Sequence, residues 1–260
     1  MDLRLNGKRV AVSGATKGIG RAVAYAFADE GCALLLAARD GDALRDTAVD
    51  LRESRGVAVE TYRGDLSTSE HQLGFARACA GTDILINCAG SNPAGGIEDI
   101  SDKVWRDSWD LKVFSYINIT RAVFTDMKTR GGGVIVNVIG NSADRMNDKY
   151  ILGSTGNLAL AGLTKALGAR SPDFGVRILG VHPGATATDR IQGLLRDWSI
   201  GKYGTPNHAD DVLASMNLPF GRLCDPSEIA DAVVFLASPR ASYVSGTILT
   251  VDGGATNRNN

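Results

Sequence analysis

Short, continuous apolar runs alternate with amphipathic stretches along most of the 260-residue chain. Apolar runs of this length, bounded by glycine and polar residues, are typical of buried strands, and the amphipathic stretches have helical spacing. Strands are expected at residues 8–13, 32–38, 57–63, 83–87, 134–139, 176–181 and 247–251. Helices are expected at residues 19–30, 42–54, 67–80, 101–130, 149–170 and 227–237.

The strand runs are apolar throughout rather than at every second position, so helices should cover both faces of the sheet. Strands that alternate with helices predict an α/β fold: a Rossmann-like, doubly wound parallel sheet with helices on both faces. No linker or internal repeat interrupts the pattern, so residues 1–260 are expected to form a single domain. Residues 187–222 break the alternation with a long, more polar insertion after a strand, which favours a substrate lid.

Composition excludes several classes of function. The formal net charge of −1, without a basic block, argues against nucleic acid as a partner. No apolar run reaches the roughly 18 residues of a membrane-spanning helix, and the N-terminus is too polar for a signal peptide. We therefore expect a soluble, cytoplasmic protein with no membrane partner. The four cysteines and three histidines lack metal-ligand spacing, so no metal site is expected.

The first strand, turn and helix carry a glycine-rich sequence. Glycines let the backbone approach a pyrophosphate closely, and the following helix offers free N–H groups and the positive end of its dipole. A dinucleotide is therefore expected to bind Ser13, Gly14, Thr16, Lys17, Gly18, Ile19 and Gly20. The alternative is a glycine turn without a ligand.

The glycines are spaced G-x-x-x-G-x-G, which resembles the short-chain dehydrogenase/reductase superfamily. Further motifs follow in the family's order: Asp65-Leu66, Asn87-Cys88-Ala89-Gly90, His182-Pro183-Gly184-Ala185-Thr186-Ala187-Thr188 and Val251-Asp252-Gly253-Gly254. The resemblance implies that the adenine contacts Asp65 and Leu66. It implies further cofactor contacts from Asn87, Ala89 and Gly90, and from a loop around the nicotinamide amide with Pro183, Gly184, Thr186 and Thr188.

The choice of cofactor is read at the end of the second strand, where a site that prefers NAD places an acid for the ribose hydroxyls. Here that position reads Ala37-Ala38-Arg39, and the glycine turn adds Lys17. Two cations suit a 2′-phosphate, because arginine binds phosphate with two N–H groups and lysine adds a point charge. NADP(H) is therefore expected rather than NAD(H). The alternative is that both cations are solvated surface charges.

The resemblance also implies a reaction. In the family, a tyrosine exchanges a proton with an alcohol or ketone, and a lysine four residues further on stabilises its phenolate form. A serine at the end of the fifth strand holds the substrate oxygen, and an asparagine of the preceding long helix completes a proton relay. Here Tyr150 is taken as the tyrosine, Ser154 stands at the lysine position, Gly140 at the serine position and Lys112 at the asparagine position.

These departures leave three hypotheses. In the first, Lys112 supplies the cation that Ser154 cannot, and Asn141 or Ser142 holds the substrate oxygen. The chain is then an NADP-dependent oxidoreductase that interconverts an alcohol and a ketone by hydride transfer. In the second, it binds the cofactor without redox turnover, as a regulator or a relic. The third is non-redox chemistry on the same scaffold.

The resemblance implies a homodimer or homotetramer as well. Helices 101–130 and 149–170 would form the interface, with Trp105, Trp109, Phe114 and Tyr116 as anchors. In the expected lid, Ile191, Leu194, Leu195 and Trp198 recur at helical spacing and form an apolar face. Cations and acids are mixed in the lid, so the sequence predicts only a medium-sized, partly apolar alcohol or ketone as the substrate.

Overall fold

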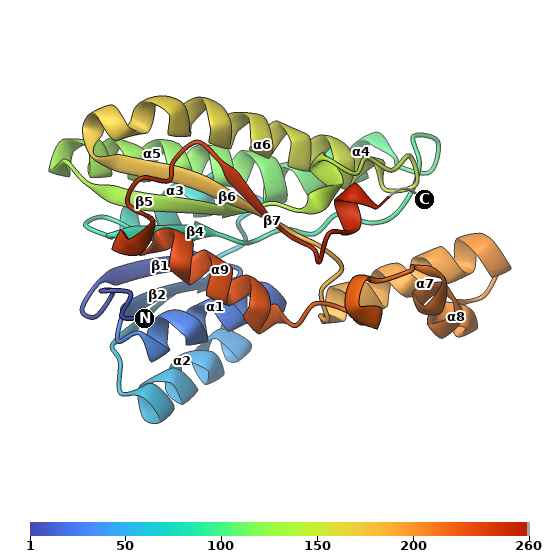
Figure 1. Cartoon of the computed structure of the whole chain (residues 1–260), viewed down its shortest axis with the longest axis horizontal. Helices are drawn as coiled ribbons and strands as arrows, with labels where there is room; N and C mark the ends of the chain where they lie inside the picture. Colours follow the sequence, from blue (N-terminus) through green and yellow to red (C-terminus); the bar gives the residue numbers. More distant parts are fainter. Residues whose placement is uncertain (259–260) are drawn as a thin grey trace.

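The computed structural model describes residues 1–258. At its centre, the strands form one parallel sheet in the order β3-β2-β1-β4-β5-β6-β7 (Figure 1). The strands are β1 (Arg9–Ser13), β2 (Ala33–Ala38), β3 (Val59–Arg63), β4 (Ile84–Asn87), β5 (Gly133–Val138), β6 (Val176–Pro183) and β7 (Ile248–Val251). Because the order reverses between β1 and β4, their C-terminal ends open the crevice in which such sheets bind ligands.

Helices cover both faces of this sheet, as the apolar strands predict (Figure 1). One layer contains α1 (Gly18–Asp29), α2 (Gly41–Arg55) and α9 (Pro226–Ala237). The other contains α3 (Ser69–Ala78), α4 (Asp102–Trp109), α5 (Ser115–Arg130) and α6 (Ile151–Arg170). Strand β2 shows why its sequence is apolar throughout, because Leu34 and Leu36 pack in one core and Leu35 and Ala37 in the other. The predicted fold class is confirmed.

The helix predicted over residues 101–130 is interrupted. Between α4 and α5, residues Asp110–Phe114 form one π-helical turn. Such turns are rare and occur often at functional sites, since they redirect a side chain that a regular helix would place elsewhere. This turn carries Lys112 and buries it.

The insertion after β6 forms a pair of helices, α7 (Asp189–Tyr203) and α8 (Ala209–Ser215), which extends beyond the C-terminal edge of the sheet (Figure 1). Ile191, Leu195 and Val212 give the pair a small core of its own. Part of the apolar face predicted for the lid therefore packs within the insertion. Within residues 1–258, no helix is both long and apolar enough to cross a membrane.

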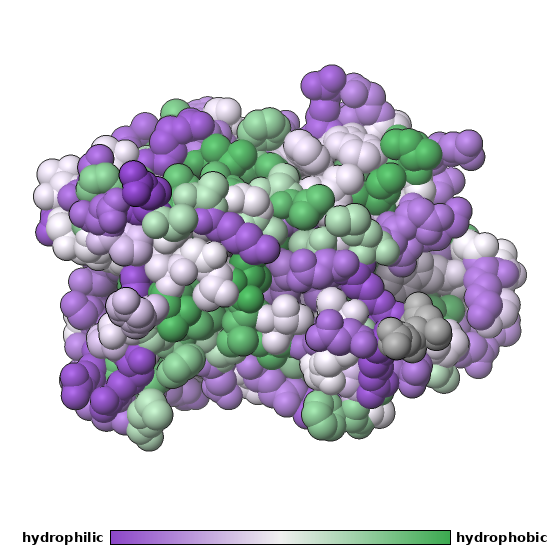
Figure 2. Space-filling model, turned by 45° about the horizontal axis from the view of Figure 1, so that its top comes forward, coloured by the Kyte–Doolittle hydropathy of each residue, from purple (hydrophilic) through white to green (hydrophobic). Residues whose placement is uncertain are grey.

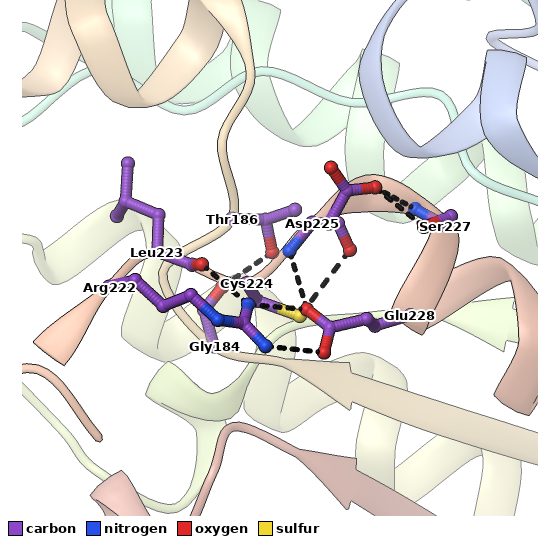
Figure 3. A network of polar contacts seen from close by, with 8 residues as sticks. All are labelled: Gly184, Thr186, Arg222, Leu223, Cys224, Asp225, Ser227 and Glu228. Carbon is purple, nitrogen blue, oxygen red and sulfur yellow. Dashed lines mark hydrogen bonds and ion pairs between the residues drawn. The ribbon is translucent and has the colours of Figure 1, made fainter. Parts of the chain in front are cut away.

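A polar network holds the point where the insertion rejoins the domain (Figure 3). The Arg222 guanidinium donates to both carboxylate oxygens of Glu228, at 2.7 and 2.8 Å. Glu228 also accepts the Asp225 N–H, and the backbone of Cys224 pairs with the segment that leaves β6. These contacts hold the pair of helices in the insertion at both ends.

Tyr116 departs from its expected place in a subunit interface. Its side chain is fully buried and its hydroxyl donates to the Val138 carbonyl, so it cannot anchor a contact with another chain. Phe114 and Leu158 on the same side of the sheet are 45% and 48% exposed. The surface turned forward in Figure 2 shows apolar patches among polar residues. An interface built by the other expected anchors stays a prediction.

Candidate active site

A cleft of about 1290 Å³ runs along the C-terminal ends of the strands, from the glycine turn to the insertion after β6. Most residues expected to bind the cofactor form its wall. They are Gly14, Thr16, Lys17, Gly18, Ile19, Gly20, Arg39, Asp65, Leu66, Ala89, Gly90, Pro183, Gly184, Thr186 and Thr188. The sequence motifs, which lie far apart along the chain, therefore meet at one site.

The glycine turn fits a pyrophosphate. A Cβ at Gly14 would lie 2.9 Å from the Ala89 Cα, and a Cβ at Gly18 would lie 2.8 Å from the Thr188 methyl carbon. Lys17 is the N-cap of α1, and its side chain makes no capping hydrogen bond. The first N–H groups of α1 are thus left for a ligand, as an anion at a helix N-terminus requires.

Ser13 and Asn87 are not part of the cleft wall, in contrast to the expectation that they bind the cofactor. The Ser13 hydroxyl accepts the N–H groups of Cys88 and Ala89 at 2.9 and 3.2 Å. The Asn87 amide donates to Asn137 on β5 and to a threonine of α5. Both side chains are buried and hold the ends of neighbouring strands together.

At the adenine end, the side chain of Arg39 is 80% exposed and its guanidinium lies 3.9 Å from the Asp65 carboxylate. Partial burial raises the pKa of Asp65, but hydrogen bonds from Ser67 outweigh this and hold it below its usual range. Lys17 is also exposed at the cleft wall. The two cations thus remain accessible to a phosphate.

At the reacting end, Tyr150 precedes α6 as its N-cap rather than lying within the helix. Its ring folds over Gly153, where a Cβ would lie 1.8 Å from the tyrosine Cε1. Its hydroxyl accepts a hydrogen bond from Arg190 at 2.5 Å. Sequence reasoning missed Arg190, because this residue lies 40 positions further on in the lid and no local motif links it to Tyr150.

Lys112 lies in the wall of the same cleft, with its side chain packed beneath Gly90. Its ammonium donates to the Tyr116 hydroxyl at 3.1 Å and to the Val138 carbonyl at 2.9 Å. Burial lowers the pKa of Lys112 to about 8; the neighbouring Cys88 opposes this shift and the Arg190 charge adds to it. The nitrogen therefore points into the protein wall and away from bulk solvent.

Two polar groups expected to hold the substrate oxygen also line the cleft. The Asn141 amide donates to Asp252 at 3.3 Å, and the Ser142 hydroxyl accepts from Asn157 at 2.8 Å. Ser154, by contrast, is not part of the wall. Its hydroxyl accepts the Asn147 N–H and donates to the Asn147 carbonyl, at 3.0 and 3.3 Å, so it closes the loop before α6.

Comparisons with known proteins agree with this architecture. A family profile described as Enoyl-(Acyl carrier protein) reductase matches residues 14–256. The 7alpha-hydroxysteroid dehydrogenase of Escherichia coli (strain K12) is 32% identical over 260 aligned residues, which cover 97% of this chain and 96% of that protein. The galactitol 2-dehydrogenase (L-tagatose-forming) of Cereibacter sphaeroides is 34% identical over 255 residues, with 97% and 96% covered.

The chain belongs to the short-chain dehydrogenase/reductase superfamily.

Solved structures of this superfamily share the whole fold. The L-sorbose reductase of Gluconobacter frateurii, complexed with NADPH and L-sorbose, has a TM-score of 0.90 at 29% identity, with 100% of both chains covered. A 7 alpha-hydroxysteroid dehydrogenase complexed with NADH and 7-oxo glycochenodeoxycholic acid has a TM-score of 0.85 at 28% identity, covering 100% of this chain and 98% of that one. The protein is therefore a dehydrogenase or reductase of this superfamily, with NAD(H) or NADP(H) as its coenzyme.

Gly153, which lies beneath the Tyr150 ring, and Asn157 are four residues apart on α6 and so share one face of the helix. Asn157 faces the end of β5, since a Cβ at Gly140 would lie 2.5 Å from its Nδ2. Its Oδ1 is buried and has no hydrogen-bond partner within the described part of the chain. The sequence alone did not indicate Asn157, because the family spacing Y-x-x-x-K, applied from Tyr150, leads to Ser154.

Proposed function

We propose that the protein is an NADP(H)-dependent oxidoreductase that interconverts an alcohol and a ketone, with Tyr150 as the group that exchanges a proton with the substrate. The observation that carries this proposal is the placement of the Tyr150 ring over Gly153. Tyr150, from the loop before α6, thereby fills the space above Gly153. Its hydroxyl lies at the cleft beside the Arg190 guanidinium.

The same placement suggests which positions correspond to the family pattern. If Gly153 and Asn157 are the two helical positions of Y-x-x-x-K, Tyr150 replaces the side chain lost at 153. Lys112 and Asn157 would then be a reciprocal exchange of the family's asparagine and lysine. In this scheme Ser154 has a structural role, and Lys112, packed beneath Gly90 in the cleft wall, supplies the buried charge.

When bound, NADP(H) supplies or accepts the hydride at its nicotinamide ring. The chain's own residues transfer the proton and stabilise the negative charge that this transfer leaves. Tyr150 donates a proton to the developing alkoxide, or accepts one from the alcohol in the reverse direction. The Arg190 and Lys112 charges stabilise the phenolate that remains, and Asn141 or Ser142 orients the substrate oxygen.

The preference for NADP(H) rests on Lys17 and Arg39, which line the adenine end of the cleft. The L-sorbose reductase with the same fold is complexed with NADPH, whereas the 7 alpha-hydroxysteroid dehydrogenase is complexed with NADH. The choice within this fold therefore depends on local residues, and here those residues are cationic.

Binding without turnover is the second candidate, because Gly140, the second residue after β5, has no hydroxyl. NADPH titration followed by a screen of carbonyl substrates separates the two. The reciprocal exchange predicts that Lys112→Asn and Asn157→Lys each lower kcat and that the double variant recovers part of the loss. NADPH binding without turnover of any carbonyl would favour the second candidate.

A further inference from the structure

The Arg190 guanidinium is held at the reacting end of the cleft by neutral groups. It donates to the Ser91 hydroxyl at 3.3 Å, to the Asn92 carbonyl at 2.8 Å and to the Tyr150 hydroxyl at 2.5 Å. Within residues 1–258, these partners do not include a carboxylate. Three segments thus converge on one cation: the turn after β4, the N-cap of α6 and the first turn of α7.

A guanidinium has five N–H donors, and these contacts use three of them. Both Nη2 N–H groups and one Nη1 N–H are used, so the Nε–H and one Nη1 N–H remain. These donors and the positive charge suit an anion such as a carboxylate, through single charge-assisted hydrogen bonds. Ser91 and Asn92 fix the guanidinium beside the reacting group before any substrate arrives, which lowers the entropy cost of binding.

Other side chains around the substrate end of the cleft also carry more positive than negative charge. The loop from 145 to 150 and the start of α7 contribute charged residues to this part of the wall, and cations outnumber acids there. The cations are Lys112, Arg145, Lys149 and Arg190, and the acids are Asp148, Asp189 and Asp252. Ile191, Leu194 and Trp198 supply an apolar surface next to them. The lid sequence considered by itself shows no such preference, because half of this charge comes from the loop before α6.

We infer that the substrate is an oxo acid or hydroxy acid whose carboxylate binds Arg190. This inference rests on the proposed function, because the reacting oxygen is assigned to Tyr150. The Arg190 nitrogen and the Tyr150 oxygen lie 2.5 Å apart, so the carboxylate and the reacting carbon are separated by no more than a short link. A 2-oxo or 3-oxo acid with an apolar tail meets both requirements.

The first test compares each acid with its uncharged form. The protein saturated with NADPH is assayed with 2-oxo and 3-oxo acids and with their methyl esters. We expect kcat/KM to be roughly 100-fold higher for the preferred acid than for its ester, as for a charge-assisted hydrogen bond. In Arg190→Gln this preference disappears, and in Arg190→Lys part of it remains. Arg196→Gln, on the exposed side of the same helix, keeps it.

Two results would overturn the inference. One is equal reduction of acid and ester by the unmodified protein, and the other is an Arg190→Gln variant that lowers both rates by the same factor. The second result would mean that Arg190 serves only the Tyr150 phenolate. NADPH affinity, measured for each variant, shows whether the cleft has kept its fold, and Arg190→Lys retains the charge if the glutamine variant does not fold.

A binding experiment separates this inference from the proposed function. Oxamate, an unreactive mimic of a 2-oxo acid, is titrated into the NADPH-loaded protein by calorimetry. Oxamate binding that weakens roughly tenfold or more in Arg190→Gln supports the anion site even if no carbonyl is reduced. Reduction of neutral ketones, without oxamate binding and without a preference for acids, would retain the proposed function and refute the anion site.

Discussion

The ring of Tyr150 lies over Gly153, in the space that any side chain at position 153 would need. This relationship links a helix position without a side chain to a tyrosine that comes from outside the helix. It explains why a glycine near the start of α6 is compatible with an intact cleft. It also makes the position of Tyr150 dependent on a single neighbouring residue.

Gly153→Ala should therefore displace the Tyr150 ring. The added Cβ would overlap the ring, and overpacking of this kind costs about 1–3 kcal/mol unless the ring moves. We expect kcat to fall by roughly tenfold or more while the Kd for NADPH stays unchanged. Gly162→Ala on the same helix is the matched control, because a Cβ there meets nothing within 4 Å. It should raise the free energy of unfolding by about 0.5–1 kcal/mol and leave kcat unaltered.

The buried charge of Lys112 gives the reaction a pH dependence. Its pKa is lowered to about 8, so the ammonium is present below this pH and is lost as the pH rises through it. If the charge stabilises the Tyr150 phenolate, kcat/KM should fall above about pH 8. Lys112→Met should have a low rate at every pH, whereas Lys165→Met, exposed on α6, should keep the original profile. A Lys112→Met rate equal to that of the unmodified protein would remove Lys112 from the mechanism.

The same residue affects stability with a defined sign. Between about pH 8 and the ordinary lysine pKa of 10.5, the unfolded chain binds a proton that the folded protein has lost, so stability rises with pH in this window. Lys112→Met should flatten this rise. It should also stabilise the protein at neutral pH, because it removes the cost of burying the Lys112 charge while the Val138 carbonyl keeps its hydrogen bond from Tyr116. Urea unfolding across the pH range measures both effects.

Cofactor choice should follow the charge at position 39. Arg39→Asp removes a phosphate contact and adds an acid near the ribose, so NADPH should bind roughly ten- to a hundredfold more weakly and NADH more tightly. Arg45→Asp, on α2 and outside the cleft wall, is the control and should leave both affinities unchanged. Tighter binding of NADH than of NADPH by the unmodified protein would contradict the assignment.

His182 gives a second pH effect, in the acidic range. It is buried on β6 and paired with Asp144 at 2.9 Å. Burial lowers its pKa below the ordinary 6.5, and the Asp144 carboxylate only partly offsets this. The unfolded chain therefore takes up the proton first as the pH falls below 6.5, and the folded state loses stability there. His182→Gln should reduce this loss in urea unfolding.

The sheet and its layers could be predicted from the sequence because burial on both faces leaves a direct mark on strand composition. Strand β2 reads ALLLAA, and its side chains alternate between two cores. The cofactor wall was predictable for a related reason. Gly14 and Gly18 have positive φ angles and leave no room for a side chain, because a Cβ would meet the Ala89 backbone at Gly14 and the Thr188 methyl group at Gly18.

The reacting end was predictable only in part. Tyr150 and Lys112 line the cleft as the sequence predicts, but the partner of the Tyr150 hydroxyl is Arg190 on α7, and no periodicity connects Tyr150 with Arg190. The helical count from Tyr150 reached Ser154, since nothing in the sequence shows that α6 begins at Ile151. A contact between distant segments depends on the tertiary fold and has no local signal.

The central claim is that Tyr150 exchanges the proton in an NADPH-dependent carbonyl reduction. Its most direct test is the rate of NADPH oxidation by the best carbonyl substrate for the unmodified protein and for Tyr150→Phe, which keeps the ring over Gly153 and removes only the hydroxyl. We predict that kcat falls by roughly 100-fold or more, while the Kd for NADPH is unchanged. An equal rate in Tyr150→Phe would contradict the claim.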